Sequence, residues 1–346
     1  MNKLTKIGVT ALAGSLMSLS VSAGEMAVTG TAEVTYTTSS NSAQTTGNPW
    51  GAKNNIGFKG SGDVNGFAVS YGTVMNDAMS GASSSLLTVD MGALGLVGID
   101  NGTGSFGTDT ADDSILPTAY EEPSHNGGSG SLGISGSSNV LGYKNTFMGL
   151  SVNAEYNSDF SGERNGDGVY SGVGPADVAA TAANELFEAQ TQGSSFNYVV
   201  SYEVMDGLTV GGGFGETETV ATTAGANQDS QENTAYVKYS MGGLSVGYFQ
   251  NEYQKGNTVG ADGKMTTGHS VAFAVNESLS ISYASRDVEF DDGDLSNNTE
   301  KNSAIMASYT MGGASVRLAH NEHENPGGSL VVNDTENTEL SLVLAF

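Results

Sequence analysis

The sequence is short of cysteine, proline and positive charge. It contains no cysteine, five prolines, and 12 lysines and arginines against 38 aspartates and glutamates. The lack of cysteine excludes disulfides, so stability must come from the backbone network and from packing. The formal net charge of −26 makes nucleic acid an unsuitable partner, since phosphate contacts require a basic surface. The same charge favours cations and cationic solutes, whose local concentration rises in a negative potential.

Long hydrophobic runs are also missing once the first residues are passed. Lys3 and Lys6 precede a short apolar stretch, and Val21 and Ala23 supply the small residues of a cleavage site. This pattern predicts a signal peptide over residues 1–23 and an exported domain over residues 24–346. No stretch of that domain approaches the roughly 18 to 20 apolar residues of a membrane helix. The exported chain is therefore expected to be soluble or to cross a membrane without helices.

One stretch, GLSVG at residues 243–247, fits the G-x-S-x-G pattern of a serine hydrolase, with Ser245 as the nucleophile. Related stretches recur at residues 148–152, 206–210, 277–281 and 312–316, where the chain reads MGLSV, DGLTV, ESLSI and GGASV. A catalytic serine would occur once, and its turn would lead into a helix. The repeats follow short turns between alternating segments, so we expect hairpins here and no enzyme.

Apolar and polar residues alternate along the whole exported domain, which indicates β-strands. The segment FNYVVSYEVMDGLTVGGGF, for example, alternates on both sides of Asp206-Gly207, a dipeptide typical of tight hairpin turns. About sixteen such strands, joined alternately by long loops and tight turns, predict an all-β fold, a sixteen-stranded antiparallel transmembrane β-barrel with periplasmic turns and external loops. The predicted strands cover residues 25–37, 52–62, 66–76, 83–92, 94–101, 138–147, 149–158, 194–205, 207–218, 233–241, 243–253, 268–276, 278–289, 301–311, 313–322 and 335–346.

Charged and amide side chains in these strands fall on the parity opposite to the apolar residues. A lipid-facing charge near the membrane centre costs on the order of 2 to 4 kcal/mol, whereas a charge in a water-filled lumen stays solvated. The residues expected to face the lumen on this ground are Glu33, Asn55, Asp90, Glu155, Glu203 and Lys238. A soluble sandwich with one buried face would show the same alternation, but it does not explain the last strand.

That strand, NTELSLVLAF, alternates Leu340, Leu342 and Leu344 and stops on Phe346. An alternating strand that ends on an aromatic residue resembles the assembly signal of Gram-negative outer-membrane proteins. Two further stretches, NNIGFKGSGDVNGFAVSYG and VLGYKNTFMGLSVNAEYN, resemble hairpins of the trimeric general diffusion porins. Together these features extend along most of the chain, which is similar to that family and in particular to its glycine-rich alphaproteobacterial members.

The resemblance implies a water-filled passage through each barrel and a homotrimer in the outer membrane. It also implies contact with lipopolysaccharide and insertion by the barrel-assembly machinery, which reads the C-terminal strand. In the family the third external loop, here residues 101–139, folds inward and narrows the passage. The acidic residues that this implies at the constriction are Asp109, Asp112, Asp113, Glu121 and Glu122. The basic residues implied on the facing wall are Lys53, Lys59, Lys144, Arg286 and Arg317.

The positive wall is thinner than the family pattern, because Asn55 stands where enterobacterial relatives often carry a basic residue. A thinned positive wall opposite an acidic loop predicts passive passage of small hydrophilic solutes and ions, with a preference for cations. A substrate-selective channel of the same fold is the first alternative.

The acidic stretch EFDDGDLSNN at residues 289–298 raises a second alternative. Its carboxylates, with Asp291, Asp292 and Asp294 at the centre, offer the oxygen ligands that calcium prefers. The stretch lacks the full spacing of an EF-hand, so a solvated loop explains it as well. The alternative class is a calcium-dependent surface or adhesion protein, and no other cofactor is expected. In the fourth external loop, Pro175 and the alanines after it predict a short helix within residues 175–190.

Overall fold

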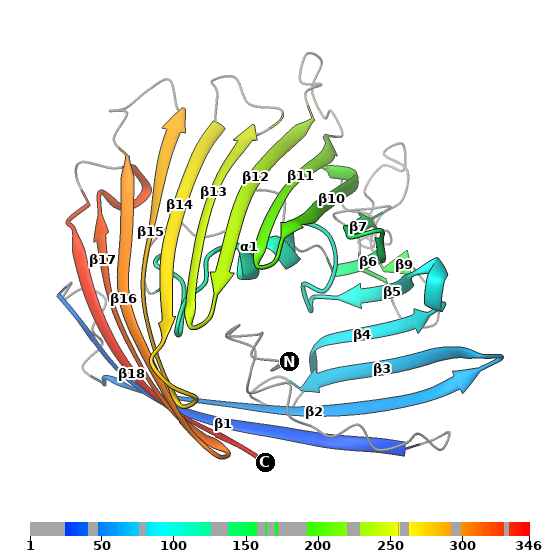
Figure 1. Cartoon of the computed structure of the whole chain (residues 1–346), viewed down its shortest axis with the longest axis horizontal. Helices are drawn as coiled ribbons and strands as arrows, with labels where there is room; N and C mark the ends of the chain where they lie inside the picture. Colours follow the sequence, from blue (N-terminus) through cyan, green and yellow to red (C-terminus); the bar gives the residue numbers. More distant parts are fainter. Residues whose placement is uncertain are drawn as a thin grey trace, which may run out of the picture.

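The computed structural model describes residues 25–40, 48–75, 81–125, 138–157, 163–164, 170–171, 192–219, 229–254, 256, 263–291, 299–328 and 332–346. The predicted signal peptide and the predicted helix within residues 175–190 lie outside these ranges. In the described chain, sixteen antiparallel strands close into one barrel, seen as a ring in Figure 1. Its strands are β1 Glu25–Ser39, β2 Trp50–Val64, β3 Phe67–Met75, β4 Ala82–Asp90, β5 Leu96–Asn101, β6 Ser138–Phe147, β7 Leu150–Asn157, β10 Gln192–Met205, β11 Leu208–Thr219, β12 Ser230–Met241, β13 Leu244–Gln254, β14 Gly263–Ala274, β15 Leu279–Asp291, β16 Glu300–Met311, β17 Ala314–Glu324 and β18 Thr335–Ala345.

The predicted barrel is therefore confirmed, strand by strand. The largest difference is in β14, which begins at Gly263 rather than at residue 268. The tight turns occur where the repeats predicted them. At Met148-Gly149, for instance, φ is 51° and 85°, the left-handed pair of a two-residue type I′ hairpin turn. None of the helices in the described ranges is both long and apolar enough to cross a membrane.

The barrel closes between β1 and β18, the first and last strands. Gly30 and Phe346 exchange two backbone hydrogen bonds, each with an N···O distance of 3.0 Å. A Cβ on Gly30 would lie 3.1 Å from the Phe346 ring, so the glycine leaves room for this aromatic side chain. The terminal phenylalanine is thus the residue that completes the ladder, which leaves the sheet without an open edge.

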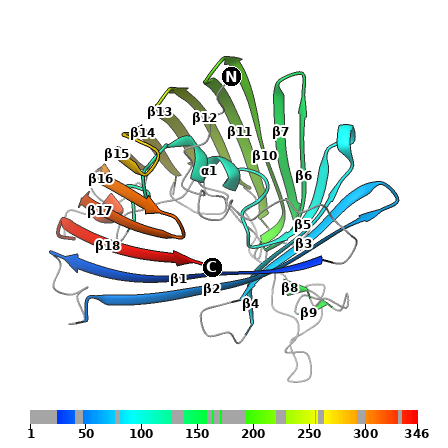
Figure 2. The same cartoon turned by 60° about the horizontal axis from the view of Figure 1, so that its bottom comes forward.

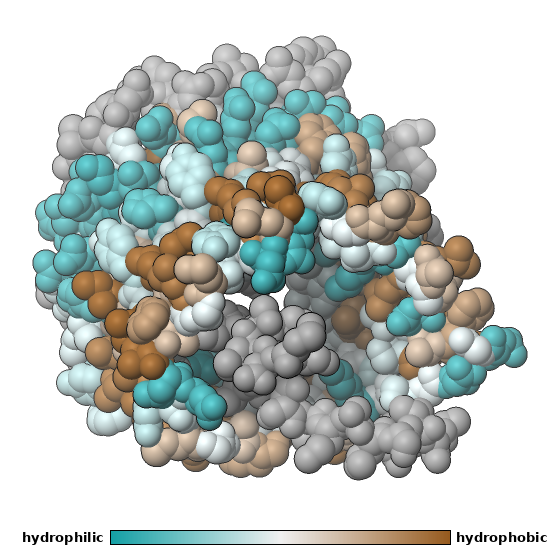
Figure 3. Space-filling model, in the orientation of Figure 1, coloured by the Kyte–Doolittle hydropathy of each residue, from teal (hydrophilic) through white to brown (hydrophobic). Residues whose placement is uncertain are grey.

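Apolar side chains cover the outer face of the barrel and polar side chains fill the inner one. In β18, Leu340, Leu342 and Leu344 are exposed, whereas Glu339 and Ser341 are buried. Asn337 of the same strand is buried too, and buried asparagines lie on other strands at Asn197, Asn251, Asn302 and Asn321. The space-filling view shows a molecule hollowed at its centre (Figure 3). An apolar exterior around a polar interior is the arrangement of a barrel in lipid.

The remaining elements are short. Helix α1 (Asp109–Ile115) belongs to the connection between β5 and β6, and two 3-10 turns cover η1 (Gly92–Leu94) and η2 (Pro326–Gly328). Strands β8 (Glu163–Arg164) and β9 (Tyr170–Ser171) form a separate two-stranded sheet. Figures 1 and 2 both place α1 inside the barrel, beside the strands from β10 to β13.

Candidate functional site: the loop inside the barrel

The connection between β5 and β6 folds into the barrel, as the sequence resemblance implied (Figure 2). Residues 102–125 of it are described, and we call this segment the inner loop. The loop first contacts β5 and β6, then packs helix α1 on the strands near β10 to β13, and ends at β18 and β1. It meets the wall at three places, and each uses a different kind of contact.

The first contact is made by an aromatic ring lying on glycines. Phe106 is fully buried, and a Cβ on Gly142 would lie 2.0 Å from its Cγ, while a Cβ on Gly98 would lie 2.7 Å from its Cζ. The ring therefore fits only because both strands lack side chains there. Next to it, the backbone N–H of Thr108 donates to Oδ1 of Asn197 at 2.7 Å. This end of the loop is fixed by packing and by buried hydrogen bonds.

The second contact is helix α1. Its Ala111 and Ile115 are buried in an apolar cluster with Val199 and Phe249 of the wall. A Cβ on Gly247 would lie 2.1 Å from the carbonyl oxygen of Ile115, so the loop backbone rests directly on β13. Gly247 is the last residue of the GLSVG stretch that resembled a hydrolase motif. In the structure this glycine leaves room for the backbone of the loop.

Ser245 lies in β13 close to a tight turn, as the repeat predicted. Its Oγ lies 2.9 Å from Oγ of Ser240, its cross-strand partner. Ser245 is followed by the rest of strand β13, which runs to Gln254. The turn and helix that follow a hydrolase nucleophile are therefore absent at this serine.

The third contact surrounds Tyr120. Its side chain is buried with Ala284, Ala304 and Met306 in a second apolar cluster. Its hydroxyl donates to Oε1 of Glu339 at 2.7 Å. The ring of Tyr120 packs on residues of β15 to β17 and its hydroxyl bonds to Glu339 of β18, so this one side chain holds the loop against four strands.

Two arginines of the wall also contact the inner loop. Nη1 of Arg286 lies 3.1 Å from Oε2 of Glu122, and this arginine, almost fully buried, also lies over the Phe249 ring at 5.5 Å. The guanidinium of Arg317 lies 5.4 Å from the centre of the Tyr120 ring. Both arginines were predicted to line the wall, and both have their charge beside the loop itself.

A group of carboxylates gathers where the loop meets the barrel seam. Glu33 accepts hydrogen bonds from Ser341 and, at 3.4 Å, from Tyr120, while His125 lies 3.5 Å from Glu339 and 3.8 Å from Glu121. Burial raises the pKa of Glu121. Burial also raises the pKa of Tyr120, and its hydrogen bond to Glu339 raises it further. This seam cluster (Glu33, Tyr120, Glu121, His125 and Glu339) brings three carboxylates together beside the loop.

The other predicted lumen residues divide into two groups. Glu155 is buried and accepts from Nδ2 of Asn197 at 2.6 Å, and Lys238 donates from Nζ to the carbonyl oxygen of Ser114 at 3.1 Å. Both therefore support the inner loop. By contrast, Asp90 accepts from the N–H of Gly92, and Glu203 accepts from the N–H of Gly207. These two carboxylates stabilise turns at the rim of the barrel. The alternation of the strands predicts only which face a residue is on, so it could not separate a residue at the rim from one in the middle of the wall.

Strand β2 carries three further predicted residues. Lys53, Asn55 and Lys59 share the parity opposite to Trp50 and Phe58, which are exposed. In the ladder, Lys53 lies opposite Glu33 and Lys59 opposite Ala27. None of the loop contacts above falls on β2, and Figures 1 and 2 draw β2 on the side of the ring opposite to helix α1, so these lysines belong to the part of the wall across the lumen from the helix.

Some predicted site residues are described only in part. Asp109 begins helix α1, while the side chains of Asp112 and Asp113, in the same helix, lie outside the described structure. Asp291 is the last residue of β15, and Asp292 and Asp294 lie outside the described ranges. Among the described residues, no group of three or more metal-ligating side chains is placed to hold an ion. The calcium hypothesis stays a prediction.

Several residues that fix the loop were not predicted. They are Phe106 with its glycines, Tyr120 and His125. Glu339 was expected on the lumen side, because it is an acidic residue on the polar parity of its strand, but its contact with the loop was not predicted. The other residues gave no such signal, since their partners lie far away in the sequence.

No family model and no curated protein matches the sequence. Solved structures do match along nearly all of it. A porin refined at 1.8 Å resolution is 14% identical, with a TM-score of 0.63 over 93% of this chain and 100% of that chain. An anion-selective porin from Comamonas acidovorans is 14% identical, with a TM-score of 0.62 over 93% and 100%. OmpF of Salmonella typhi, in complex with daunomycin, is 12% identical, with a TM-score of 0.61 over 93% and 98%.

The chain therefore has the sixteen-stranded fold of the general diffusion porins, with the third loop inside the barrel. This confirms the fold that the terminal strand and the two hairpins implied. The anion-selective structure among the neighbours shows that the fold does not set the sign of the ions that pass.

The seam cluster predicts a pH dependence of the inner loop. The pKa of His125 lies above its usual value of 6.5, chiefly because of Glu339. A raised histidine pKa means that the charged form stabilises the folded contact, fully below 6.5 and less as the pH rises through the folded pKa. We therefore expect the amides near His125 to exchange hydrogen more slowly at about pH 6 than at about pH 9, after correction for intrinsic exchange.

The matched variant is His125→Gln, which keeps a polar side chain but cannot gain a proton. Its corrected exchange should be the same at both pH values. An equal pH dependence in the variant and in the parent protein would show that His125 is not the responsible group.

Proposed function

We propose that the protein is an outer-membrane porin that lets small hydrophilic solutes and ions diffuse passively, with a preference for cations. The observation that carries the proposal is a polar loop packed inside a barrel whose outer face is apolar and whose inner face is polar. Such a barrel encloses water, and the loop reduces its cross-section. Selection then follows from the width of the narrowed passage and from the charges that line it.

The preference for cations rests on the balance of charge beside the loop. Glu33, Glu121 and Glu339 lie together at the seam, while the charges of Arg286 and Arg317 lie beside Glu122 and the Tyr120 ring. Lys53 faces Glu33 across the β1–β2 ladder. The formal charge of −26 adds a negative potential over the whole molecule.

The assembly and its surroundings are part of the same proposal. One structural neighbour, OmpT of Vibrio cholerae, was solved in a trimer form. A homotrimer is therefore proposed here, as are export with the predicted signal peptide, insertion by the barrel-assembly machinery through the strand that ends at Phe346, and contact with lipopolysaccharide. The proposed role is transport alone, without catalysis.

Liposome swelling tests the proposal without regard to ion preference. Purified protein in vesicles should admit small neutral sugars such as arabinose, with rates that fall steeply as the solute grows, because the inner loop sieves by size. A rate that depends on the chemistry of one solute rather than on size would favour the substrate-selective alternative. No swelling from correctly folded protein would contradict a channel of either kind.

A further inference from the structure

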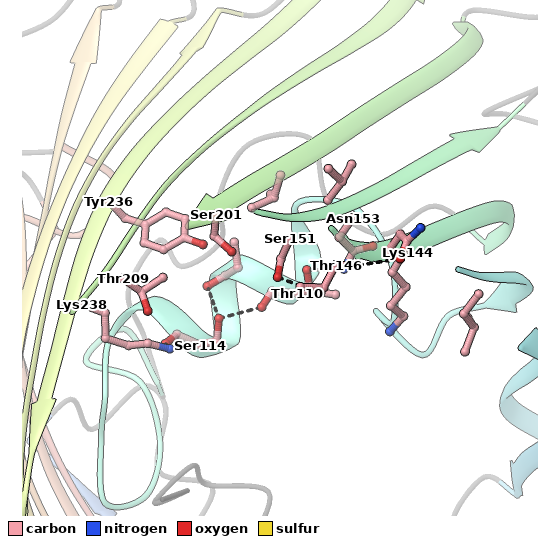
Figure 4. Close-up of a pocket in the computed structure, with 15 residues that line it drawn as sticks. Thr110, Ser114, Lys144, Thr146, Ser151, Asn153, Ser201, Thr209, Tyr236 and Lys238 are labelled. Atoms are coloured by element: carbon pink, nitrogen blue, oxygen red, sulfur yellow. Dashed lines mark hydrogen bonds between the residues drawn. The ribbon is translucent and has the colours of Figure 1, made fainter. Parts of the chain in front are cut away.

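A cavity of about 460 Å³ lies between helix α1 and the barrel wall. Figure 4 shows side chains from the helix and from the wall strands converging on it. Several of them stand next to tight turns: Thr146 and Ser151 flank the turn at Met148-Gly149, and Thr209 follows the turn at Asp206-Gly207. The cavity therefore lies on the turn side of the inner loop, where a solute arrives after passing the loop from the external side.

The charge carried by the described lining of this cavity is opposite to that of the protein. Among the described residues that line it, Lys144 and Lys238 alone are charged, and they stand at its two ends (Figure 4). Asp100, whose charge acts on Lys144, does not line the cavity. Its carboxylate accepts hydrogen bonds from the N–H groups of Thr103 and Ser105, each at 2.7 Å.

The two lysines are held but keep donors for a ligand. Lys238 donates from Nζ to the Ser114 carbonyl at 3.1 Å, and an ammonium group has three N–H donors, so two remain. Nζ of Lys144 lies 4.9 Å from the centre of the Phe106 ring, which supports the cation without using its donors. The inner loop thus positions both ammonium groups.

The rest of the lining offers hydroxyl oxygens. The hydroxyls of Thr146 and Ser151 bond to each other at 3.0 Å, and Thr110 accepts from Asn153 at 2.8 Å while donating to Gly107. A hydroxyl oxygen has two lone pairs, so each member of such a pair can still accept from a ligand. The cavity therefore presents cationic donors at its ends and acceptors between them.

We propose that this cavity is a binding subsite for small organic anions that carry several hydroxyl groups, such as sugar acids. The anionic group binds an ammonium of Lys144 or Lys238, and the hydroxyls of the solute donate to the serine and threonine oxygens. The volume suits a molecule of about six carbons, at the lower end of ordinary ligand sites. The proposal rests on the proposed channel, because the solute reaches the cavity through the lumen.

Single-channel recording with gluconate tests the subsite. Gluconate added on the turn side should interrupt the current for resolvable times, whereas sorbitol, which has similar hydroxyls and no charge, should not. Lys144→Gln and Lys238→Gln should each weaken gluconate binding by about tenfold, the effect of one charge-assisted hydrogen bond. Lys301→Gln is the control, because Lys301 is exposed at the loop-side end of β16, and it should bind gluconate like the parent protein.

The proposal is overturned if sorbitol interrupts the current as gluconate does, or if the double lysine variant conducts and binds gluconate unchanged. An absence of conductance in the parent protein would contradict the channel instead. The subsite is then tested by saturation-transfer NMR of gluconate with the detergent-solubilised protein. A signal lost in the double variant supports the subsite, and a signal equal in both proteins overturns it.

Discussion

Gly142→Val is expected to release the first contact of the inner loop and to raise the single-channel conductance. A Cβ at this position would lie 2.0 Å from Cγ of Phe106, near the fixed base of that side chain, so the ring must leave the wall. Overpacking of this kind costs about 1 to 3 kcal/mol, and here it destabilises the state in which the loop is packed on the wall. With Phe106 displaced, the loop should narrow the passage less and should be cut faster by added protease.

Two comparisons make this result specific. Gly60→Val adds the same bulk to β2, where a new Cβ meets nothing within 4 Å, and should conduct like the parent protein. Phe106→Ala removes the ring without adding bulk to a strand and should share the phenotype of Gly142→Val. Unchanged conductance and protease resistance in both loop variants would show that this contact does not hold the loop.

Replacing Asp109, Asp112 and Asp113 together with asparagine is expected to reduce the preference for cations. All three residues belong to helix α1, inside the barrel. In water a unit charge acts on an ion about 8 Å away with roughly 0.5 kcal/mol, so three charges contribute on the order of 1.5 kcal/mol. A cation is stabilised by this energy and an anion is destabilised by as much, so the cation-to-anion permeability ratio should fall by up to about 100-fold at low salt and by less at high salt, where screening is stronger.

The matched control changes three carboxylates elsewhere. Glu322, Glu324 and Glu336 are exposed near the loop-side ends of β17 and β18, and their replacement with glutamine removes the same net charge outside the lumen. Its reversal potential should stay close to that of the parent protein. If both triple variants shift the potential equally, the effect comes from the overall charge and helix α1 does not line the path of the ions.

The barrel could be predicted because its signal is local. In β18, Leu340, Leu342 and Leu344 are exposed and Glu339, Ser341 and also Val343 are buried, so the alternation of position in NTELSLVLAF gives the face of each side chain. The tight turn at Asp206-Gly207 was equally readable, since Asp-Gly between alternating segments is typical of a hairpin turn. The assembly role that the resemblance implies for Phe346 stays a prediction, and its bonds to Gly30 could not be read from the alternation.

The site could be predicted only in outline, because its contacts join distant parts of the chain. Tyr120 and Glu339 are 219 residues apart, and neither carries a pattern that points to the other. Helix α1 has seven residues, with Ala111 and Ile115 as its buried side, which is too short for a periodic signal. Of the 49 glycines, those beneath the loop can be recognised only once its path is known.

The reversal potential of the parent protein in a planar bilayer under a KCl gradient decides whether the barrel holds a water-filled passage that prefers cations. We expect stepwise conductance, with closures in groups of three for a trimer, and a reversal potential displaced toward that of potassium. A reversal potential displaced toward that of chloride would contradict the assigned role of the acidic loop and seam. Correctly folded protein without conductance would contradict the channel itself.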